Sequence, residues 1–346
     1  MALTVPALAA CRGAPTPVVS TSPPSASPGA SPALPPPEPV PSPAAAPPTQ
    51  LPPASAPGVY VTGGEGAALA SRPGGPALGR LAANVPLPYA EVSEGWVKVL
   101  TPCEREGWMA RSSGSMLPPA TVVLDPGHGG DENGAMGSAG LTEKEVNLDV
   151  ALEAAERLRS EGIGAVVTRT ADYRATLAFR ARFAAAAHAS ALVSIHHNAD
   201  PDGPLPRPGT ETYFQYRSPE SRRLAGLLFE EVAAALARFP ASWVGDTDAG
   251  AKWRLNSAGA DYYGILRRPA ESGVVASLAE LAFVSNPSEE ALLRREDVRR
   301  EEARAVARAL ARFLRTPDAG SGFTNPYPRS EPAGPGGGRT GCRDPS

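Results

Sequence analysis

The sequence predicts an α/β fold, with a mostly parallel twisted sheet covered by helices on both faces, preceded by a small all-β barrel. Between residues 119 and 315, apolar runs typical of buried strands, such as TVVLD at 121–125, alternate with segments of helix length. Residues 58–118 instead contain short β-prone pieces separated by Gly and Pro. With 346 residues, 42% of them hydrophobic, the chain can bury at least one substantial core.

The first 57 residues lack the composition of a folded domain. Residues 1–12 contain Leu8-Ala9-Ala10-Cys11, which resembles the lipobox of bacterial lipoproteins, although no Lys or Arg precedes it. Residues 13–57 are rich in Pro and carry one charged residue, Glu38, and no aromatic residue, so we expect a disordered, extended linker. We interpret residues 1–12 as the remnant of an export signal. Anchoring to a membrane through a lipid on Cys11 and export without lipid remain alternatives.

Residues 58–118 are expected to form an antiparallel barrel of about five strands. The pieces GVYVTG, GWVKVL and EGWMA are β-prone, and Gly precedes Trp at both Trp96 and Trp108. This spacing resembles the closing strands of bacterial Src-homology-3-like (SH3-like) domains. Two interpretations of the tryptophans remain. Both belong to the barrel core, which we favour, or they form a face that binds cell wall.

Strands and helices are expected to alternate through residues 119–315. After the strand at 121–125, a helix is marked by Thr142 as its N-cap, by an apolar face, and by Gly162 at its end. The elements expected next are a strand at 163–170, a helix at 174–190, strands at 191–199 and 209–216, a helix at 218–239, a strand at 274–284 and a helical stretch at 288–314. We expect the polar, Gly- and Pro-rich tail, residues 316–346, to be disordered.

Charge, hydropathy and cysteine content narrow the class of protein. A formal net charge of -3 gives no basic footprint for nucleic acid. Beyond the N-terminus, no stretch reaches the roughly 18 unbroken apolar residues of a membrane helix. Cys11, Cys103 and Cys342 lack paired spacing, which excludes a cysteine zinc ribbon. We expect Cys103 and Cys342 to be unpaired thiols, with a disulfide between them as the alternative if Cys11 carries lipid.

Histidines stand at the ends of two apolar strands. His128 follows the first strand in a Pro-Gly-His-Gly-Gly turn, and His196 and His197 end the strand that begins at residue 191. Adjacent strand residues point to opposite faces, so only one of His196 and His197 can face a common site. Two histidines and one carboxylate with an open fourth position are the pattern of a catalytic zinc.

Three glutamates are candidates to complete such a site. Glu143 and Glu145 lie in the first turn of a predicted helix, where the helix dipole favours acids, and spacing alone does not choose between them as the ligand. Glu280 interrupts an apolar strand, and burying an unpaired carboxylate is costly. A metal-bound water or a substrate would give Glu280 a partner.

Four motifs in order resemble those of the zinc-dependent N-acetylmuramoyl-L-alanine amidases. They are Asp-Pro-Gly-His-Gly-Gly at 125–130, Glu-Lys with Asn-Leu at 143–148, Ser-Ile-His with Asn-Ala at 194–199, and Glu-Leu with Phe and Ser-Asn-Pro at 280–287. The resemblance implies that one Zn²⁺ is held by His128, Glu143 and His196, and that Glu280 is the catalytic acid and base.

The same resemblance implies the substrate and the location. The expected reaction is hydrolysis of the amide between the lactyl group of N-acetylmuramic acid and L-alanine in peptidoglycan. Such an enzyme takes part in cell-wall remodelling or daughter-cell separation, so we expect an exported protein of the periplasm or cell envelope. The sequence does not identify a regulatory protein.

The sequence departs from the family pattern at three places. Glu132 stands where the family usually has Asp, Ala282 where it has Gly, and Ala249-Gly250-Ala251-Lys252 where it has Arg-Gly-Val-Lys. None of these departures removes a ligand, so we expect them to affect the grip on substrate and not catalysis.

The remaining polar residues near the motifs are interpreted as supporting residues. We expect Asp125 to hydrogen-bond His128 or its turn, and Asn198 to orient the His196 loop. His188 and His197 are expected to be structural, with substrate contact as an alternative for His197. Arg169 and Arg180 are expected to be scaffold or surface residues, and residues 241–263 to form a gating loop.

Two other classes of function fit part of the pattern. In the first, the protein is a non-catalytic wall-binding or activator protein whose catalytic domain has decayed, and retention of all four motif residues argues against it. In the second, it is a zinc peptidase that cuts the stem peptide of peptidoglycan. Analysis of the reaction products separates these alternatives.

Overall fold

The computed structural model describes residues 56–199, 201, 203–324 and 338–346, all of which belong to one compact unit, residues 50–346. The signal remnant at 1–12, with Cys11, and nearly all of the Pro-rich linker lie outside the described residues. Among the described residues, no helix is both long and apolar enough to cross a membrane.

The N-terminal part of the described chain is an antiparallel sheet. Its seven strands follow the order β3-β2-β6-β5-β4-β1-β7. Their bounds are β1 Gly58–Thr62, β2 Ala67–Ala70, β3 Ala77–Leu81, β4 Pro86–Ser93, β5 Trp96–Leu100, β6 Glu106–Ala110 and β7 Gly114–Met116, with a short 3-10 turn, η1, at Arg111–Ser113 between the last two. The expected strand number was too low because several of these strands span only three to five residues and show little alternation.

The core of this sheet differs from the favoured interpretation of its tryptophans. Val97, Val99 and Met109 are buried, whereas Trp96 and Trp108 are only half-buried. Trp96 and Trp108 alternate along β5 and β6 with those core residues, so the pleat turns both rings to the opposite face. The two rings are therefore not core residues.

A second sheet, mostly parallel, forms the centre of residues 119–315. Its strand order is β14-β12-β15-β10-β8-β9, and every neighbouring pair is parallel except β12 with β15. The strands are β8 Val122–Pro126, β9 Ala165–Val167, β10 Ala191–Asn198, β12 Glu211–Phe214, β14 Ala251–Lys252 and β15 Ala276–Phe283; a separate two-stranded ladder joins β11 Gly203–Pro204 to β13 Val244–Gly245.

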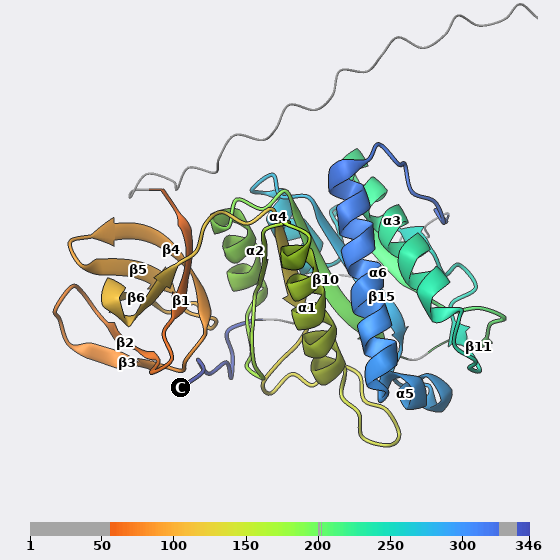
Figure 1. Cartoon of the computed structure of the whole chain (residues 1–346), viewed down its shortest axis with the longest axis horizontal. Helices are drawn as coiled ribbons and strands as arrows, with labels where there is room; N and C mark the ends of the chain where they lie inside the picture. The colour runs from red at the N-terminus through yellow and green to blue at the C-terminus, as the bar shows by residue number, and fades with distance from the viewer. Residues whose placement is uncertain (1–55, 200, 202, 325–337) are drawn as a thin grey trace, which may run out of the picture. The chain divides into compact units, whose positions relative to one another are not determined.

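Helices cover both faces of this sheet. The helices are α1 Glu143–Ser160, α2 Leu177–Ala186, α3 Pro219–Leu236, α4 Gly264–Ala270, α5 Pro287–Leu293 and α6 Glu296–Arg315. Val122 and Leu124 of β8 pack into the core formed with α1, α3 and α6, while Val123 between them packs with α2 and α4. Figure 1 shows α6 alongside α3 and α1. The predicted α/β layer arrangement is confirmed.

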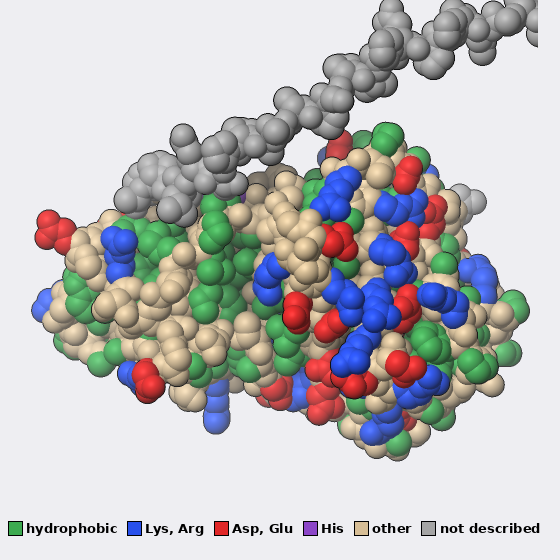
Figure 2. Space-filling view, viewed as in Figure 1, with side chains coloured by type: hydrophobic (Ala, Val, Ile, Leu, Met, Phe, Trp, Pro, Cys, Tyr) green, Lys and Arg blue, Asp and Glu red, His purple; other side chains and the backbone are tan. Residues whose placement is uncertain are grey.

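The outer side of α6 is densely charged. Figure 2 shows Lys, Arg, Asp and Glu side chains gathered over this helix. The charges are largely paired: Arg312 lies 2.9 Å from both Glu230 and Glu231 of α3, and Arg308 lies 2.8 Å from Glu231. Exposed pairs of this kind contribute little to stability, so the apolar inner face is what holds α6 on the sheet.

The C-terminal tail contradicts two predictions. Cys103 and Cys342 form a disulfide and are not unpaired thiols. Residues 317–324 and 338–346 are not disordered: Thr324 donates to the carbonyl of Ala251 at 3.0 Å, and Asp344 pairs with Arg105 at 3.0 Å. Composition alone misses this order because the tail docks on groups supplied by distant parts of the chain.

Candidate functional site

His128 stands in a turn whose backbone is held by buried arginines. The turn follows β8, and His128 has a φ of 58°, in the left-handed region that non-glycine residues rarely adopt. Arg180 donates to the carbonyl of His128 at 2.8 Å, and Arg169 donates to that of Gly127 at 2.9 Å. Both arginines are buried, so they are scaffold residues and not surface residues. Their hydrogen bonds offset the unfavourable conformation.

Two glycines let the backbone approach the site closely. A Cβ at Gly127 would collide with the ring of His196, and a Cβ at Gly134 would collide with the carboxylate of Glu143. Gly134 also has a φ of 69°. The glycines of this segment are therefore required by the packing of the site side chains themselves.

Asp125 stabilises the base of the same turn. Its carboxylate accepts hydrogen bonds from Ser194 at 2.7 Å and from Thr168, and it forms an ion pair with Arg180. Burial raises the pKa of Asp125, but Arg180 and the two hydroxyl donors lower it by a larger amount, so the pKa of Asp125 is below its usual range. Of the two expected interactions, the structure has the one with the turn: Arg180 pairs with Asp125 and donates to the backbone carbonyl of His128.

Glu143 projects from the first turn of α1. Its carboxylate is buried and accepts from the backbone N–H of Ala135 at 2.7 Å and of His197 at 3.2 Å. Glu145, the other candidate from the sequence, instead accepts from the backbone N–H of Thr142 at 3.2 Å and caps the helix. Of the two, only Glu143 lies beside the histidines.

The pleat of β10 separates the two adjacent histidines, as expected. His196 lies on the α2 and α4 side, with Nδ1 2.8 Å from Oε1 of Glu143. His197 is fully buried on the opposite side, within hydrogen-bonding distance of Asn147 and Glu302. This position leaves His197 without access to a substrate.

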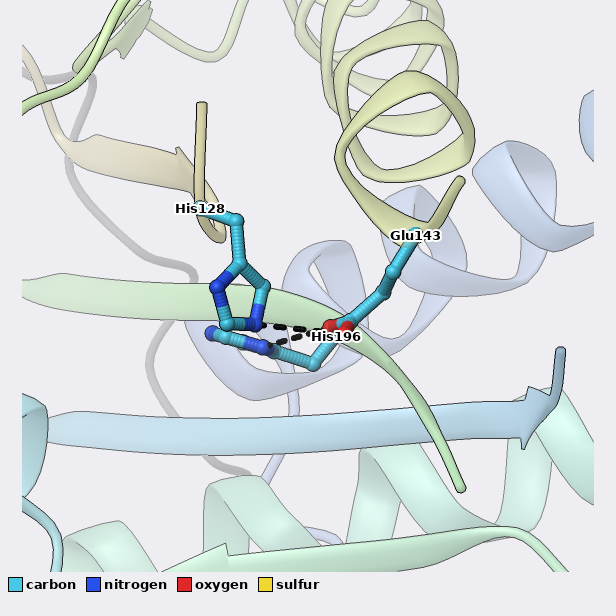
Figure 3. Close-up of side chains that lie close together, drawn as sticks. All are labelled: His128, Glu143 and His196. Atoms are coloured by element: carbon cyan, nitrogen blue, oxygen red, sulfur yellow. Dashed lines mark hydrogen bonds and ion pairs between the residues drawn. The ribbon is translucent and has the colours of Figure 1, made fainter. Parts of the chain in front are cut away.

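His128, Glu143 and His196 converge on one point. The Nε2 atom of His128 is 3.2 Å from Oε2 of Glu143, and the possible ligand atoms of the three residues all lie within 4.8 Å of one another. Figure 3 shows the three side chains pointing toward one another from the turn after β8, the start of α1 and strand β10. Two imidazoles and a carboxylate form a group that could hold a metal ion.

The electrostatics of this group favour a carboxylate anion. Burial raises the pKa of Glu143, but hydrogen bonds from His128 and His196 outweigh that effect and hold its pKa well below the usual range. Burial lowers the pKa of His196, which favours the neutral imidazole. An ionised carboxylate and a neutral imidazole are the protonation states that bind metal.

Glu280 stands one strand away from His196. The two residues are register partners between β10 and β15, and Glu211 of β12 is the partner of Glu280 on the other side. Oε2 of Glu280 is buried and has no hydrogen-bond partner within the described part of the chain. Burial, with the nearby charges of Glu143 and Glu211, raises the pKa of Glu280 well above its usual range.

A cavity of about 500 Å³ opens beside the converging side chains. His128 and His196 line it, together with Glu132 and with Tyr262 and Tyr263, which directly precede α4. Glu280 borders this group through its strand pairing but is not one of the lining residues. Only the end of the expected gating segment, 241–263, reaches the cavity.

Comparison with known proteins identifies the family. A model of the N-acetylmuramoyl-L-alanine amidase family matches residues 122–312, more than half of the chain. The chain belongs to this family. Its amidase domain includes all of the converging side chains, and the resemblance inferred from the four motifs is confirmed.

Three similar proteins illustrate the relationship. The uncharacterized protein YqiI of Bacillus subtilis is 35% identical over 192 residues, which cover 55% of this chain and 82% of YqiI. The N-acetylmuramoyl-L-alanine amidase LytC of the same organism is 35% identical over 188 residues, 54% of this chain but only 34% of LytC. The solved structure of Cwp6 from Clostridium difficile matches with 27% identity and a TM-score of 0.50, covering 57% of this chain and 29% of Cwp6.

Family membership confirms the expected class of enzyme. The chain is a peptidoglycan amidase, a hydrolase of amide bonds. Because peptidoglycan lies outside the cytoplasmic membrane, this activity implies an exported protein or one of the cell envelope.

Several residues around the candidate site were not found from the sequence. Asn147 donates to Oε1 of Glu143 at 3.2 Å. Its place in the second motif was a signal that could have identified it. Arg254 donates to the hydroxyl of Tyr263 at 2.6 Å, and Lys252 forms a buried ion pair with Glu211 at 2.7 Å. Asn198, which the sequence did single out to orient the His196 loop, donates to Glu211 at 3.1 Å and so joins this pair to the end of β10. Nothing in the local sequence predicts these pairings, because each joins different elements.

Proposed function

We propose that residues 119–315 act as a zinc-dependent N-acetylmuramoyl-L-alanine amidase, with His128, Glu143 and His196 as metal ligands and Glu280 as the catalytic acid and base. The observation that carries this proposal is the convergence of two imidazoles and a carboxylate beside Glu280, which has a buried oxygen without a hydrogen-bond partner among the described residues. A non-catalytic protein has no need to retain such a costly arrangement.

The donor set fits zinc. Imidazole and carboxylate are ligands that Zn²⁺ accepts in catalytic sites, with three protein ligands and one open position. The cavity beside His128 and His196 supplies room for that open position. When bound, Zn²⁺ supplies Lewis-acid chemistry, which polarises a carbonyl group and makes water more acidic.

Glu280 moves the proton in the proposed reaction. As a carboxylate, it accepts a proton from the attacking water while the new C–O bond forms. It then donates that proton to the amide nitrogen as the C–N bond breaks, so that the leaving group departs as a neutral amine. Its raised pKa supports this role because a carboxylate of ordinary pKa is a weak base toward water, whereas one whose pKa lies nearer the working pH can both accept the proton and return it.

The bond that is cut decides between an amidase and a stem-peptide peptidase. Purified sacculi treated with the zinc-loaded full chain should release peptides that begin with L-alanine and leave intact glycan strands. Mass spectrometry of the soluble products, with dinitrophenylation of new amino termini, measures this outcome. Shortened stem peptides that remain attached to muramic acid would contradict the proposal.

The seven-stranded sheet is proposed to be an SH3-like domain that binds the cell wall. Trp96 is half-buried and lines a groove of about 670 Å³ together with the Gly63–Gly66 turn and residues 112–115. Aromatic side chains at the surface of a groove are frequent in binding sites. The test is a pull-down on purified sacculi, in which Trp96→Ala should reduce binding while amidase activity on soluble fragments is unchanged.

Attachment to a membrane through Cys11 is also a proposal, supported by the lipobox resemblance alone. Labelling of cells with a radioactive fatty acid tests it: the wild-type chain should be labelled, and Cys11→Ala should not.

A further inference from the structure

A second polar cluster lies behind the metal ligands, on the opposite face of β10. His197 and Glu302 of α6 are both fully buried in the core between β10, α1 and α6. The Nε2 atom of His197 is 3.3 Å from Oε1 of Glu302, and its Nδ1 atom is 2.8 Å from Oδ1 of Asn147. The cluster therefore joins α6 to α1 through the strand that carries His196.

The direction of the hydrogen bonds in this cluster can be assigned. The amide nitrogen of Asn147 donates to Oε1 of Glu143 at 3.2 Å and to the carbonyl of Gly127 at 3.3 Å. Its Oδ1 atom must therefore be the acceptor toward His197, so Nδ1 of His197 carries a proton. One continuous path of hydrogen bonds leads from Glu302 through His197 and Asn147 to the carboxylate of Glu143.

Stability does not explain why this pair is buried. Oε2 of Glu302 has no hydrogen-bond partner within the described part of the chain. Burying a carboxylate with an unsatisfied oxygen is costly, and well-packed apolar residues in place of a buried ion pair are often neutral or stabilising. The neighbouring residues of α6 that face the same core, such as Val306 and Leu310, are indeed apolar.

We propose that His197 and Glu302 form a positioning pair that fixes Asn147 and, through it, the orientation of Glu143 as a metal ligand. The inference rests on the proposed zinc site. His197 hydrogen-bonds Oδ1 of Asn147, and this bond keeps the amide nitrogen of Asn147 directed at Glu143 and Gly127. Glu302 in turn fixes the ring of His197. Without the pair, Asn147 can rotate, and Oε1 of Glu143 then loses the amide donor that it has beside the backbone N–H of His197.

The affinity for zinc tests the proposal in the full-length chain. Groups that orient metal ligands typically contribute about 10- to 100-fold to metal affinity. His197→Ala should therefore raise the dissociation constant of zinc by about that factor, measured by competition with a chromogenic chelator. His197→Asn keeps a donor at the position of Nδ1 and should retain most of the affinity, whereas His197→Gln moves the donor toward Glu302 and should not.

A matched control separates positioning from loss of stability. Leu310→Ala removes buried apolar contacts on the same helix and should lower the free energy of unfolding by about 2–5 kcal/mol, with zinc affinity unchanged. The Glu302 variants give a second, independent comparison. Glu302→Gln keeps a side chain that can hydrogen-bond Nε2 of His197 and should bind zinc almost as the wild type does, whereas Glu302→Leu removes that partner and should bind zinc more weakly. If His197→Ala does not fold, the zinc affinities of the two Glu302 variants still test the positioning role.

Zinc binding by the variants separates the positioning role from the proposed function. If the wild-type chain binds zinc and His197→Ala and Glu302→Leu bind it equally well, or if Leu310→Ala weakens zinc binding as much as they do, the positioning role is wrong while the proposed function stands. If the wild-type chain itself binds no zinc, the proposed function fails first.

Discussion

The two faces of strand β10 carry the same residue type in opposite surroundings. His196 and His197 are adjacent in sequence, yet one lines a cavity beside Glu143 and the other is fully buried against α6. The alternation of a strand turns a dipeptide into two separate environments. A single strand can thus supply a group for chemistry on one face and a group that holds the chemistry in place on the other.

The strongest test of this comparison removes the residue on the cavity face. His196→Ala deletes one of three proposed ligands, so we expect loss of most bound zinc and of nearly all amidase activity. Metal content by plasma mass spectrometry and release of peptides from sacculi measure the two effects. His197→Ala is the matched control, because it should keep bound metal at saturating zinc. Full zinc content in His196→Ala would contradict the assignment.

Glu280→Gln should separate catalysis from metal binding. The variant keeps all three proposed ligands, so its zinc content should stay near one per chain. Loss of general acid and base help should reduce kcat by about 10²- to 10⁴-fold, with a much smaller change in KM. Glu143→Gln is the comparison. If Glu280→Gln lost its zinc while Glu143→Gln kept both zinc and rate, the two glutamates would have to exchange roles.

Removal of the disulfide should affect stability and neither face of β10. Cys342→Ser should lower the free energy of unfolding by about 2–4 kcal/mol, because the unfolded chain is no longer constrained. Urea unfolding at fixed zinc concentration measures this change. Zinc affinity and kcat should equal those of the wild type at 25 °C, and a change in zinc affinity larger than that of Leu310→Ala would show that the tail influences the site.

The smallest expected effect is a difference in the pH dependence of stability. Glu280 has a folded-state pKa above its unfolded value, so the native state binds more protons, and the free energy of unfolding falls as pH rises from the ordinary glutamate range through the raised pKa. Glu280→Gln does not titrate. In metal-free protein, the variant should therefore gain stability over the wild type as pH rises, by about 1.4 kcal/mol per unit of pKa shift. If the free energy of unfolding changed with pH equally in both proteins, the pKa of Glu280 would not be raised in the folded state.

The sequence predicts the site better than it predicts what supports it. The strands that carry His128 and His196 are apolar runs that end in polar motifs, and parallel strands bring such ends to one edge. The choice between Glu143 and Glu145 needed the family resemblance, because both occupy the same helical turn. Glu302 lies 105 residues from His197, in an amphipathic helix whose other acids, Glu296, Asp297 and Glu301, pair with arginines. No local pattern distinguishes Glu302 from these acids.

The disulfide makes a closed ring of most of the molecule. Cys103 precedes the amidase domain and Cys342 follows it, with a sequence separation of 239, so every strand and helix of that domain lies within one covalent loop. A protease that cuts once inside the loop opens the ring but releases no fragment. A nicked chain should run as a single species on a denaturing gel and fall into two pieces only after a thiol reductant is added. In an envelope exposed to proteases, a single cut therefore leaves the amidase domain covalently attached to the N-terminal part of its own chain.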